Sequence, residues 1–110
     1  MIVRPGDGVL HLITQPNHAA LARRIMALWP SLDKAERRRD ILTAIEHHDR
    51  GWAAPDAAPT VDPFTGTIRD FMQVPVDVRQ GVWPESVATL TAAPWAAALV
   101  AHHAVVVYDR

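Results

Sequence analysis

The stretch AIEHHDRGW, residues 44–52, decides how the rest of this sequence is interpreted. On a helix that turns by about 100° per residue, His48 and Asp49 share a face with Ile45. A carboxylate on a core-facing side is costly unless it is paired or bound to a metal. A histidine beside it can offer a ring nitrogen to the same cation. The pattern therefore predicts half of a metal site, and the simpler alternative is a pair of hydrogen-bonded core residues.

The helix that carries this pair is expected to begin near Lys34, with Ser31 or Asp33 as its N-cap. Gly51 is expected to end it, because glycine adopts the left-handed cap conformation at little cost. Arg50 falls on the polar side of the same helix. The helical-wheel positions thus predict that this helix has one core-facing side and one solvated side.

Composition limits the classes of protein that fit. The chain has 110 residues, of which 49% are hydrophobic, so one small domain with a real core is expected. A formal net charge of −1 leaves no basic surface for nucleic acid or for an anionic membrane. No signal peptide or transmembrane segment is visible in the sequence, so we expect a cytoplasmic protein.

Cysteine is absent, which excludes a disulfide framework, a thiolate zinc site and a cysteine nucleophile. A metal would therefore be held by imidazole and carboxylate groups, which suit iron, manganese or zinc. The histidines that could serve are His11, His18, His47, His48, His102 and His103.

Two elements are expected before the central helix. Short strands at residues 2–4 and 9–14 flank a proline- and glycine-rich turn and predict a hairpin. A helix should then start between Thr14 and Asn17 and run to about Trp29, with Arg23 and Arg24 pointing away from the core. The expected core-facing side of this helix consists of His18, Leu21, Ala22, Ile25, Leu28 and Trp29.

After the central helix, prolines and glycines punctuate residues 53–84, which predicts a long ordered loop instead of regular structure. A short helix is expected over residues 85–92. A last helix should run from Pro94 to about Tyr108, and because it is apolar nearly all round we expect it to be buried. The fold class is therefore mainly α: a small helical domain with a short N-terminal β-hairpin and a long Pro-rich loop.

Three of these helices bring histidine to the expected interior: His18, His48 with Asp49, and His102 or His103. Three such placements favour one shared metal site over three separate hydrogen-bonded core histidines. One histidine on a helix, His18, followed by a His-Asp dipeptide at the end of the next helix, His48-Asp49, is also the central part of a resemblance to a known family.

The segments that carry the resemblance are Met1–Arg4, Ile13–Ala19, His48–Trp52, Pro59–Phe71 and Leu99–His103. In this order they resemble an uncharacterised bacterial family, domain of unknown function 3891, whose members are similar to HD-type metal-dependent phosphohydrolases. The resemblance implies a single HD-like domain over residues 1–110, incomplete at its C-terminus.

The resemblance also implies His18, His48, Asp49 and His103 as metal ligands. The helical wheel places His102 on one stripe with Leu99, but a helix this apolar discriminates poorly, so we follow the motif and assign His103. In related, longer proteins the final Asp ligand comes from a later helix. Here Asp70, Asp109, water or a second subunit are the candidates to complete the site.

The predicted function is hydrolysis of a phosphate ester in a small-molecule substrate, because a bound divalent cation activates water and polarises a phosphoryl oxygen. Trp52 and Phe71 would form walls of the substrate site, and Arg69 would contact the phosphate. His103 or His47 could act on protons.

Two alternatives stay open. An HD-like di-iron oxygenase would use His47 and His102 as further ligands. A non-catalytic, homodimeric interaction module would have a degenerate site and would pair through the apolar last helix. Metal content together with oligomeric state distinguishes an enzyme from such a module.

Overall fold

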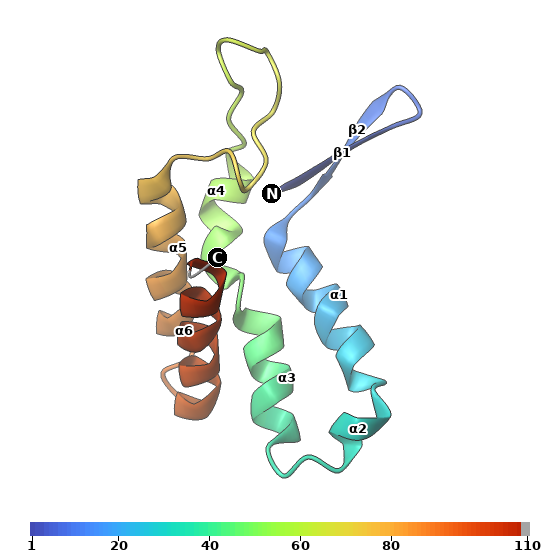
Figure 1. Cartoon of the computed structure of the whole chain (residues 1–110), viewed down its shortest axis with the longest axis vertical. Coiled ribbons are helices and arrows are strands. Elements are labelled where there is room, and N and C mark those ends of the chain that lie inside the picture. The colour runs from blue at the N-terminus through green and yellow to red at the C-terminus, as the bar shows by residue number, and fades with distance from the viewer. Residues whose placement is uncertain (109–110) are drawn as a thin grey trace.

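An antiparallel hairpin opens the fold: β1 (Ile2–Gly6) pairs with β2 (Val9–Ile13). Asp7 and Gly8 form the turn with φ of 50° and 76°, the left-handed conformations that a two-residue hairpin turn requires. The computed structural model describes residues 1–108 and shows a mainly helical protein in which this hairpin extends away from the helices (Figure 1). The predicted fold class is therefore confirmed.

Helix α1 (Gln15–Ala27) begins where the sequence predicts, because the side chain of Thr14 accepts a hydrogen bond from the backbone N–H of Asn17. The predicted core-facing side of α1 is wrong. Its large apolar residues point to solvent, whereas the small Ala19 is fully buried and Arg23 pairs with Glu46 of the next long helix at 2.9 Å. The exposed residues are Leu21, Ile25, Leu28 and Trp29. Hydropathy cannot identify the single face that meets a neighbour.

The central helix is shorter than expected. A short helix α2 (Pro30–Asp33) precedes it, and α3 (Arg38–His47) begins after Arg37 without a side-chain cap. Asp33 does not cap α3 but lies 3.3 Å from the Arg38 guanidinium. Helix α3 lies between α1 on one side and α6 on the other (Figure 1).

Gly51 does not end α3 in the left-handed conformation, so that prediction is wrong. It lies in a 3-10 turn, η1 (Arg50–Trp52), and among the described glycines only Gly8 and Gly66 have positive φ. A Cβ at position 51 would stand 2.0 Å from the backbone oxygen of Val82. The backbone N–H of Gly51 also donates to Ser86 Oγ at 2.8 Å. Glycine is needed here for close approach of another helix.

Residues 53–92 contain more helix than the sequence predicts. Helix α4 (Ala53–Ala57) follows η1, and α5 (Val76–Ala88) replaces both the end of the expected loop and the expected helix at 85–92. Pro84 lies inside α5, which packs against η1 and α6. Tertiary packing here outweighs the helix-breaking tendency of proline.

The loop between α4 and α5 is ordered, as predicted, and projects beyond the helices (Figure 1). Asp62 accepts hydrogen bonds from the backbone N–H groups of Phe64 and Thr65, and Val61 forms a bridge with Ile68. Near its end, the backbone N–H of Phe71 donates to the carbonyl of Met1 at 2.8 Å. This bond holds Phe71 beside the N-terminus.

Helix α6 (Pro94–Tyr108) has the predicted bounds but is not buried all round. Ala96 and Val100 belong to the core with Ala44 and Leu90, whereas Trp95 and Val105 are about half or more exposed (47% and 63%). The small number of neighbouring helices leaves one side of α6 in solvent. Within residues 1–108 no helix combines the length and the apolar character that a membrane crossing would demand.

A buried carboxylate joins the start of the chain to α4. Asp56 is 6% exposed, and its two oxygens accept hydrogen bonds from the amino group of Met1 and from the backbone N–H of Gln15. A buried carboxylate is tolerated when it is paired and hydrogen-bonded in this way. Asp56 thereby fixes Gln15 and the first turn of α1 relative to η1 and α4.

Candidate metal centre

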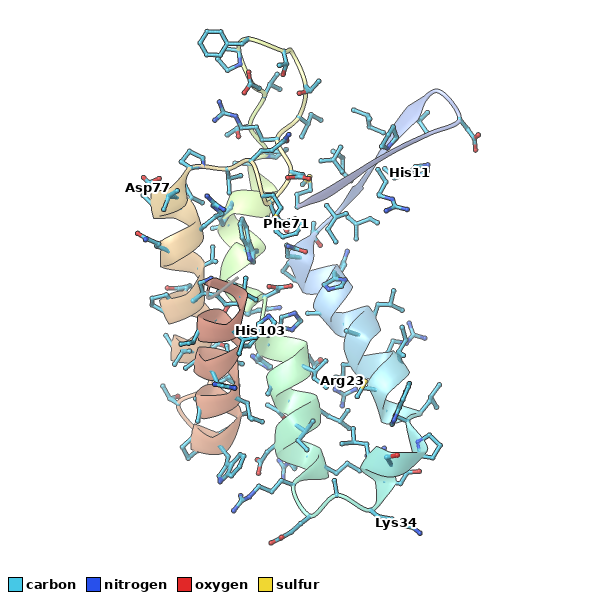
Figure 2. The ribbon with its side chains drawn as sticks, viewed as in Figure 1. His11, Arg23, Lys34, Phe71, Asp77 and His103 are labelled. Carbon is cyan, nitrogen blue, oxygen red and sulfur yellow. The ribbon has the colours of Figure 1, made fainter. Side chains whose placement is uncertain are left out.

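Three helices converge where α3 ends. His18 lies in the second turn of α1, His48 and Asp49 follow the last residue of α3, and His103 lies on the side of α6 that faces α3 (Figure 2). The ring centroid of His48 is 6.1 Å from that of His18 and 5.1 Å from that of His103. The structure thus brings three of the predicted ligands, His18, His48 and Asp49, into one group, and places the fourth, His103, in ring contact with His48 outside that group.

One ligand atom from each of His18, His48 and Asp49 lies within 4.8 Å of the other two, the spacing expected of groups that can share a metal ion. Asp49 is buried, His48 is partly buried and His18 is exposed. One side of the cluster is therefore shielded and the other is open to solvent. Among the described residues, this is the group of histidine and carboxylate side chains that meets that spacing.

The two nitrogens of His48 have different partners. Nδ1 lies 2.6 Å from the carbonyl oxygen of Ile45, which can only accept, so Nδ1 carries a hydrogen. Nε2 lies 3.1 Å from Oδ2 of Asp49. In the neutral ring, Nε2 then has a lone pair that faces a carboxylate. Such a pair needs a proton or a cation between its atoms, and a metal ion held there would be bound by Nε2 of His48 and Oδ2 of Asp49.

The surroundings shift the pKa values of two histidines in opposite directions. Burial alone would lower the pKa of His48, but the hydrogen bond and charge of Asp49, with the Ile45 carbonyl, raise it above 6.5. The pKa of His103 is lowered by burial and by the positive charge that His48 can carry, with Asp49 opposing both. His103 therefore loses its proton at a lower pH than His48 does in the metal-free cluster.

In the metal-free protein, NMR titration of the imidazole rings should show His48 titrating above pH 6.5 and His103 below it. Because the pKa of His48 is higher in the folded chain than in the unfolded chain, its charged pair with Asp49 stabilises the fold fully below pH 6.5. That contribution is lost as the pH rises through the raised pKa. In an Asp49→Asn control, burial should dominate and His48 should titrate lower. The reverse order of the two histidines would contradict this account.

A cavity of about 470 Å³ adjoins the cluster. Its walls combine the candidate ligands with aromatic and apolar side chains, and the Trp52 and Phe71 rings meet edge to face at 6.3 Å. The lining residues are Ile2, Gln15, His18, His48, Asp49, Trp52, Phe71, Met72, Arg79, Trp83, His103 and Val107. Phe71 is seen close to the N-terminal end of α1 in Figure 2. Two of the three predicted substrate-binding residues, Trp52 and Phe71, therefore line this cavity.

Arg69, the third predicted substrate-binding residue, lies elsewhere. It lines a separate cavity of about 300 Å³ with Met1 and Pro75, and its guanidinium is 3.3 Å from Oδ2 of Asp62. The lining residues of the cavity beside the cluster do not include Arg69. Its observed partner is a loop carboxylate.

Among the described residues, His47, His102 and Asp70, which the sequence also offered as ligands, do not belong to the group of ligand atoms that shares this spacing. Nδ1 of His47 is 3.0 Å from the hydroxyl of Thr89, and His102 is exposed. Asp70 accepts a hydrogen bond from the backbone N–H of Met72 within the loop. Asp109 lies outside the described residues.

Sequence analysis did not identify the polar and tryptophan residues of the cavity wall, Gln15, Arg79 and Trp83, or the apolar residues Ile2, Met72 and Val107. The ring of Trp83 meets that of His103 edge to face at 5.4 Å. Arg79 and Trp83 are four residues apart, a helical spacing that places both on one face of α5. That signal was present, but the prolines and Gly81 led to a loop assignment for this segment.

Comparison with known proteins gives one match. A family model described as "Protein of unknown function (DUF3891)" matches residues 1–110. No curated protein and no solved structure matches the chain.

Proposed function

This chain belongs to the DUF3891 family of proteins of unknown function, and on that premise we propose that it is a metal-dependent hydrolase of the HD-like type. Its substrate would be a small-molecule phosphate ester, and its setting the bacterial cytoplasm. Iron, manganese or zinc would be held by His18, His48 and Asp49, with His103 as a further ligand. The observation that carries the proposal is the approach of ligand atoms of His18, His48 and Asp49 to within 4.8 Å of one another beside a cavity of about 470 Å³.

The donor set fits a divalent transition metal. Imidazole nitrogen and carboxylate oxygen suit these ions, and the ordered Nδ1–H of His48 leaves Nε2 directed at the carboxylate of Asp49. A backbone carbonyl that holds a ligating histidine in one tautomer is a common feature of such centres. Asp49, which is 5% exposed, would contribute the negative charge that a buried cation requires.

A bound divalent cation would supply a water of lowered pKa and polarisation of a phosphoryl oxygen. In hydrolysis the oxygen of water forms a new bond to phosphorus, the P–O bond to the alcohol breaks, and the alcohol leaves with a proton from that water. The chain's own residues then have definite tasks. His103, kept neutral by its lowered pKa, can accept a proton if it is not itself a ligand. Trp52 and Phe71 shield the site from bulk water.

The test is hydrolysis of p-nitrophenyl phosphate by protein loaded separately with iron, manganese or zinc. We expect turnover with at least one metal, loss of turnover with a chelator, and loss in an Asp49→Asn variant that stays folded. Turnover should survive in Arg69→Gln, because that side chain is paired with Asp62 outside the cavity. Absence of turnover with all three metals, in protein shown to hold them, would overturn the hydrolase proposal.

A non-catalytic homodimer is the second candidate, favoured by the exposed apolar side of α6. Trp95 is 47% exposed and Val105 is 63% exposed. A contiguous apolar patch in contact with solvent is a feature of surfaces that bind another protein. Sedimentation at several protein concentrations would test this candidate, since a dimer that holds no metal would favour the module over the enzyme. The di-iron alternative is not pursued, because His47 is bonded to Thr89 and neither His47 nor His102 lines the cavity beside the cluster.

A further inference from the structure

Arg79 is the cationic side chain that lines the cavity beside the metal cluster. It is partly buried, and its Nε is inaccessible to solvent and has no hydrogen-bond partner among residues 1–108. Four other arginines, at positions 23, 37, 38 and 69, do have carboxylate partners. A partly buried guanidinium without a counter-charge is costly, and an anionic ligand would relieve that cost.

Position on α5 directs Arg79 to the same wall as the cluster. Trp83, one helical turn later on the same face, contacts the His103 ring at 5.4 Å, and His103 in turn contacts His48 at 5.1 Å. Arg79, Trp83 and the two histidines all line one cavity. A ligand in that cavity can therefore reach the cluster and the guanidinium at the same time.

Charge balance in the cavity also favours an anion. Among its described lining residues, Asp49 is the one carboxylate, and it faces the cluster side chains. With a divalent cation bound there and Arg79 charged, positive charge is in clear excess. A dianionic phosphoryl group would neutralise it, and a planar guanidinium can donate two hydrogen bonds to such a group.

A second unpartnered polar group lines the same cavity. Gln15 is 4% exposed, and its Oε1 has no hydrogen-bond partner among the described residues, although its backbone N–H is held by Asp56. Buried polar atoms are normally satisfied, so an unsatisfied acceptor in a cavity wall is a feature of ligand sites. Gln15 and Arg79 thus mark a polar wall for a ligand, independently of the metal cluster.

We propose that Arg79 binds the phosphoryl group of the ligand in this cavity. The inference rests on the proposed function for the identity of the anion as a phosphate ester. It replaces Arg69, the candidate named from the sequence, as the arginine that contacts phosphate. Arg79 is a binding residue: it holds the anion beside the cluster and is not a ligand of the metal.

The experiment is calorimetric titration of inorganic phosphate into the metal-loaded wild-type chain and into Arg79→Gln, Arg79→Lys and Arg69→Gln variants. Loss of a charge-assisted hydrogen-bonded contact should weaken phosphate binding about 10- to 100-fold in Arg79→Gln. Arg79→Lys keeps the charge but not the planar guanidinium, so its phosphate affinity should lie between that of the wild type and that of Arg79→Gln. Arg69→Gln is the matched control and should bind phosphate like the wild type. Metal content and thermal unfolding, measured for every variant, show that each is folded and loaded.

The outcomes separate the two proposals. If the wild type holds no metal, the proposed hydrolase fails, and a selective loss of phosphate binding in metal-free Arg79→Gln would still support the anion site. If metal is bound but phosphate affinity is the same in Arg79→Gln as in the wild type, the role of Arg79 is overturned and the metal centre stands. Equal losses in Arg79→Gln and Arg69→Gln, or tighter binding of acetate than of phosphate by the wild type, would also overturn it.

Discussion

A His48→Ala/Asp49→Ala double variant is expected to hold no transition metal under conditions in which the wild-type chain holds close to one equivalent. The change removes the imidazole nitrogen and the carboxylate oxygen that lie 3.1 Å apart, together with the buried negative charge. Removing even a residue that orients a ligand costs about 10- to 100-fold in metal affinity, and loss of two ligands should cost more. Elemental analysis of the purified proteins measures the result directly.

The matched control is His102→Ala. His102 is next in sequence to His103 on α6, but unlike His103 it does not line the cavity beside the cluster, so its removal should leave the metal content unchanged. His103→Ala should lower the metal content or affinity if His103 is a ligand. A metal-free wild-type chain, or a double variant that binds as much metal as the wild type, would refute the metal centre at these residues.

Gly51→Ala is expected to cause the largest loss of stability of any single methyl addition to this chain. The new Cβ would meet the backbone oxygen of Val82 at 2.0 Å and its Cα at 2.9 Å. Backbone atoms in a packed helix cannot move aside as a flexible side chain can, so α5 must shift away from η1. Overpacking of this kind costs about 3 kcal/mol or more when backbone must move. Chemical denaturation gives the free energy of unfolding.

Gly81→Ala is the control for Gly51→Ala, because Gly81 lies in α5, the helix that Gly51 approaches. A Cβ at position 81 would meet no atom within 4 Å, and Gly81 lies inside α5. This substitution should stabilise the chain by about 0.5–1 kcal/mol, because alanine loses less conformational entropy in a helix than glycine does. Equal effects of the two substitutions would show that the contact between Gly51 and Val82 does not limit stability.

Gly51 is also linked to the candidate centre, since it lies two residues after Asp49 and its N–H is bonded to the fully buried Ser86. Separation of α5 from η1 would move Asp49 and Trp83 relative to each other. We therefore expect Gly51→Ala to lower metal affinity as well as stability. The two effects have one cause: the contact that glycine permits also assembles the cavity wall.

Local signals in the sequence were sufficient for several elements. Asp7-Gly8 specifies the hairpin turn, Thr14 caps α1, and Pro94 starts α6, in each case through interactions between residues close in the chain. The helical wheel also predicted correctly that His48 and Asp49, which follow the last residue of α3, face inward and that Arg50 is exposed. These features depend on backbone conformation and periodicity, which the sequence expresses directly.

The face of α1, the extent of α5 and the role of Gly51 could not be obtained in this way. The apolar character of Leu21 and Ile25 predicts a core position, but α3 meets the side of α1 that carries Arg23, which pairs with Glu46. Pro84 predicts the end of a helix, but α5 continues through it because α5 packs against η1 and α6. In each case the deciding contact joins residues far apart in sequence.

The sequence by itself determined which residue types could bind a metal and that His48 and Asp49 face inward. Only the tertiary structure decided that His18 and His103 converge on them, that Arg79 and not Arg69 lines the adjoining cavity, and that Gly51 is needed for close helix approach. The physical reason is that side-chain chemistry and helical period act locally. The positions of helices relative to one another follow from packing that is shared over the whole chain.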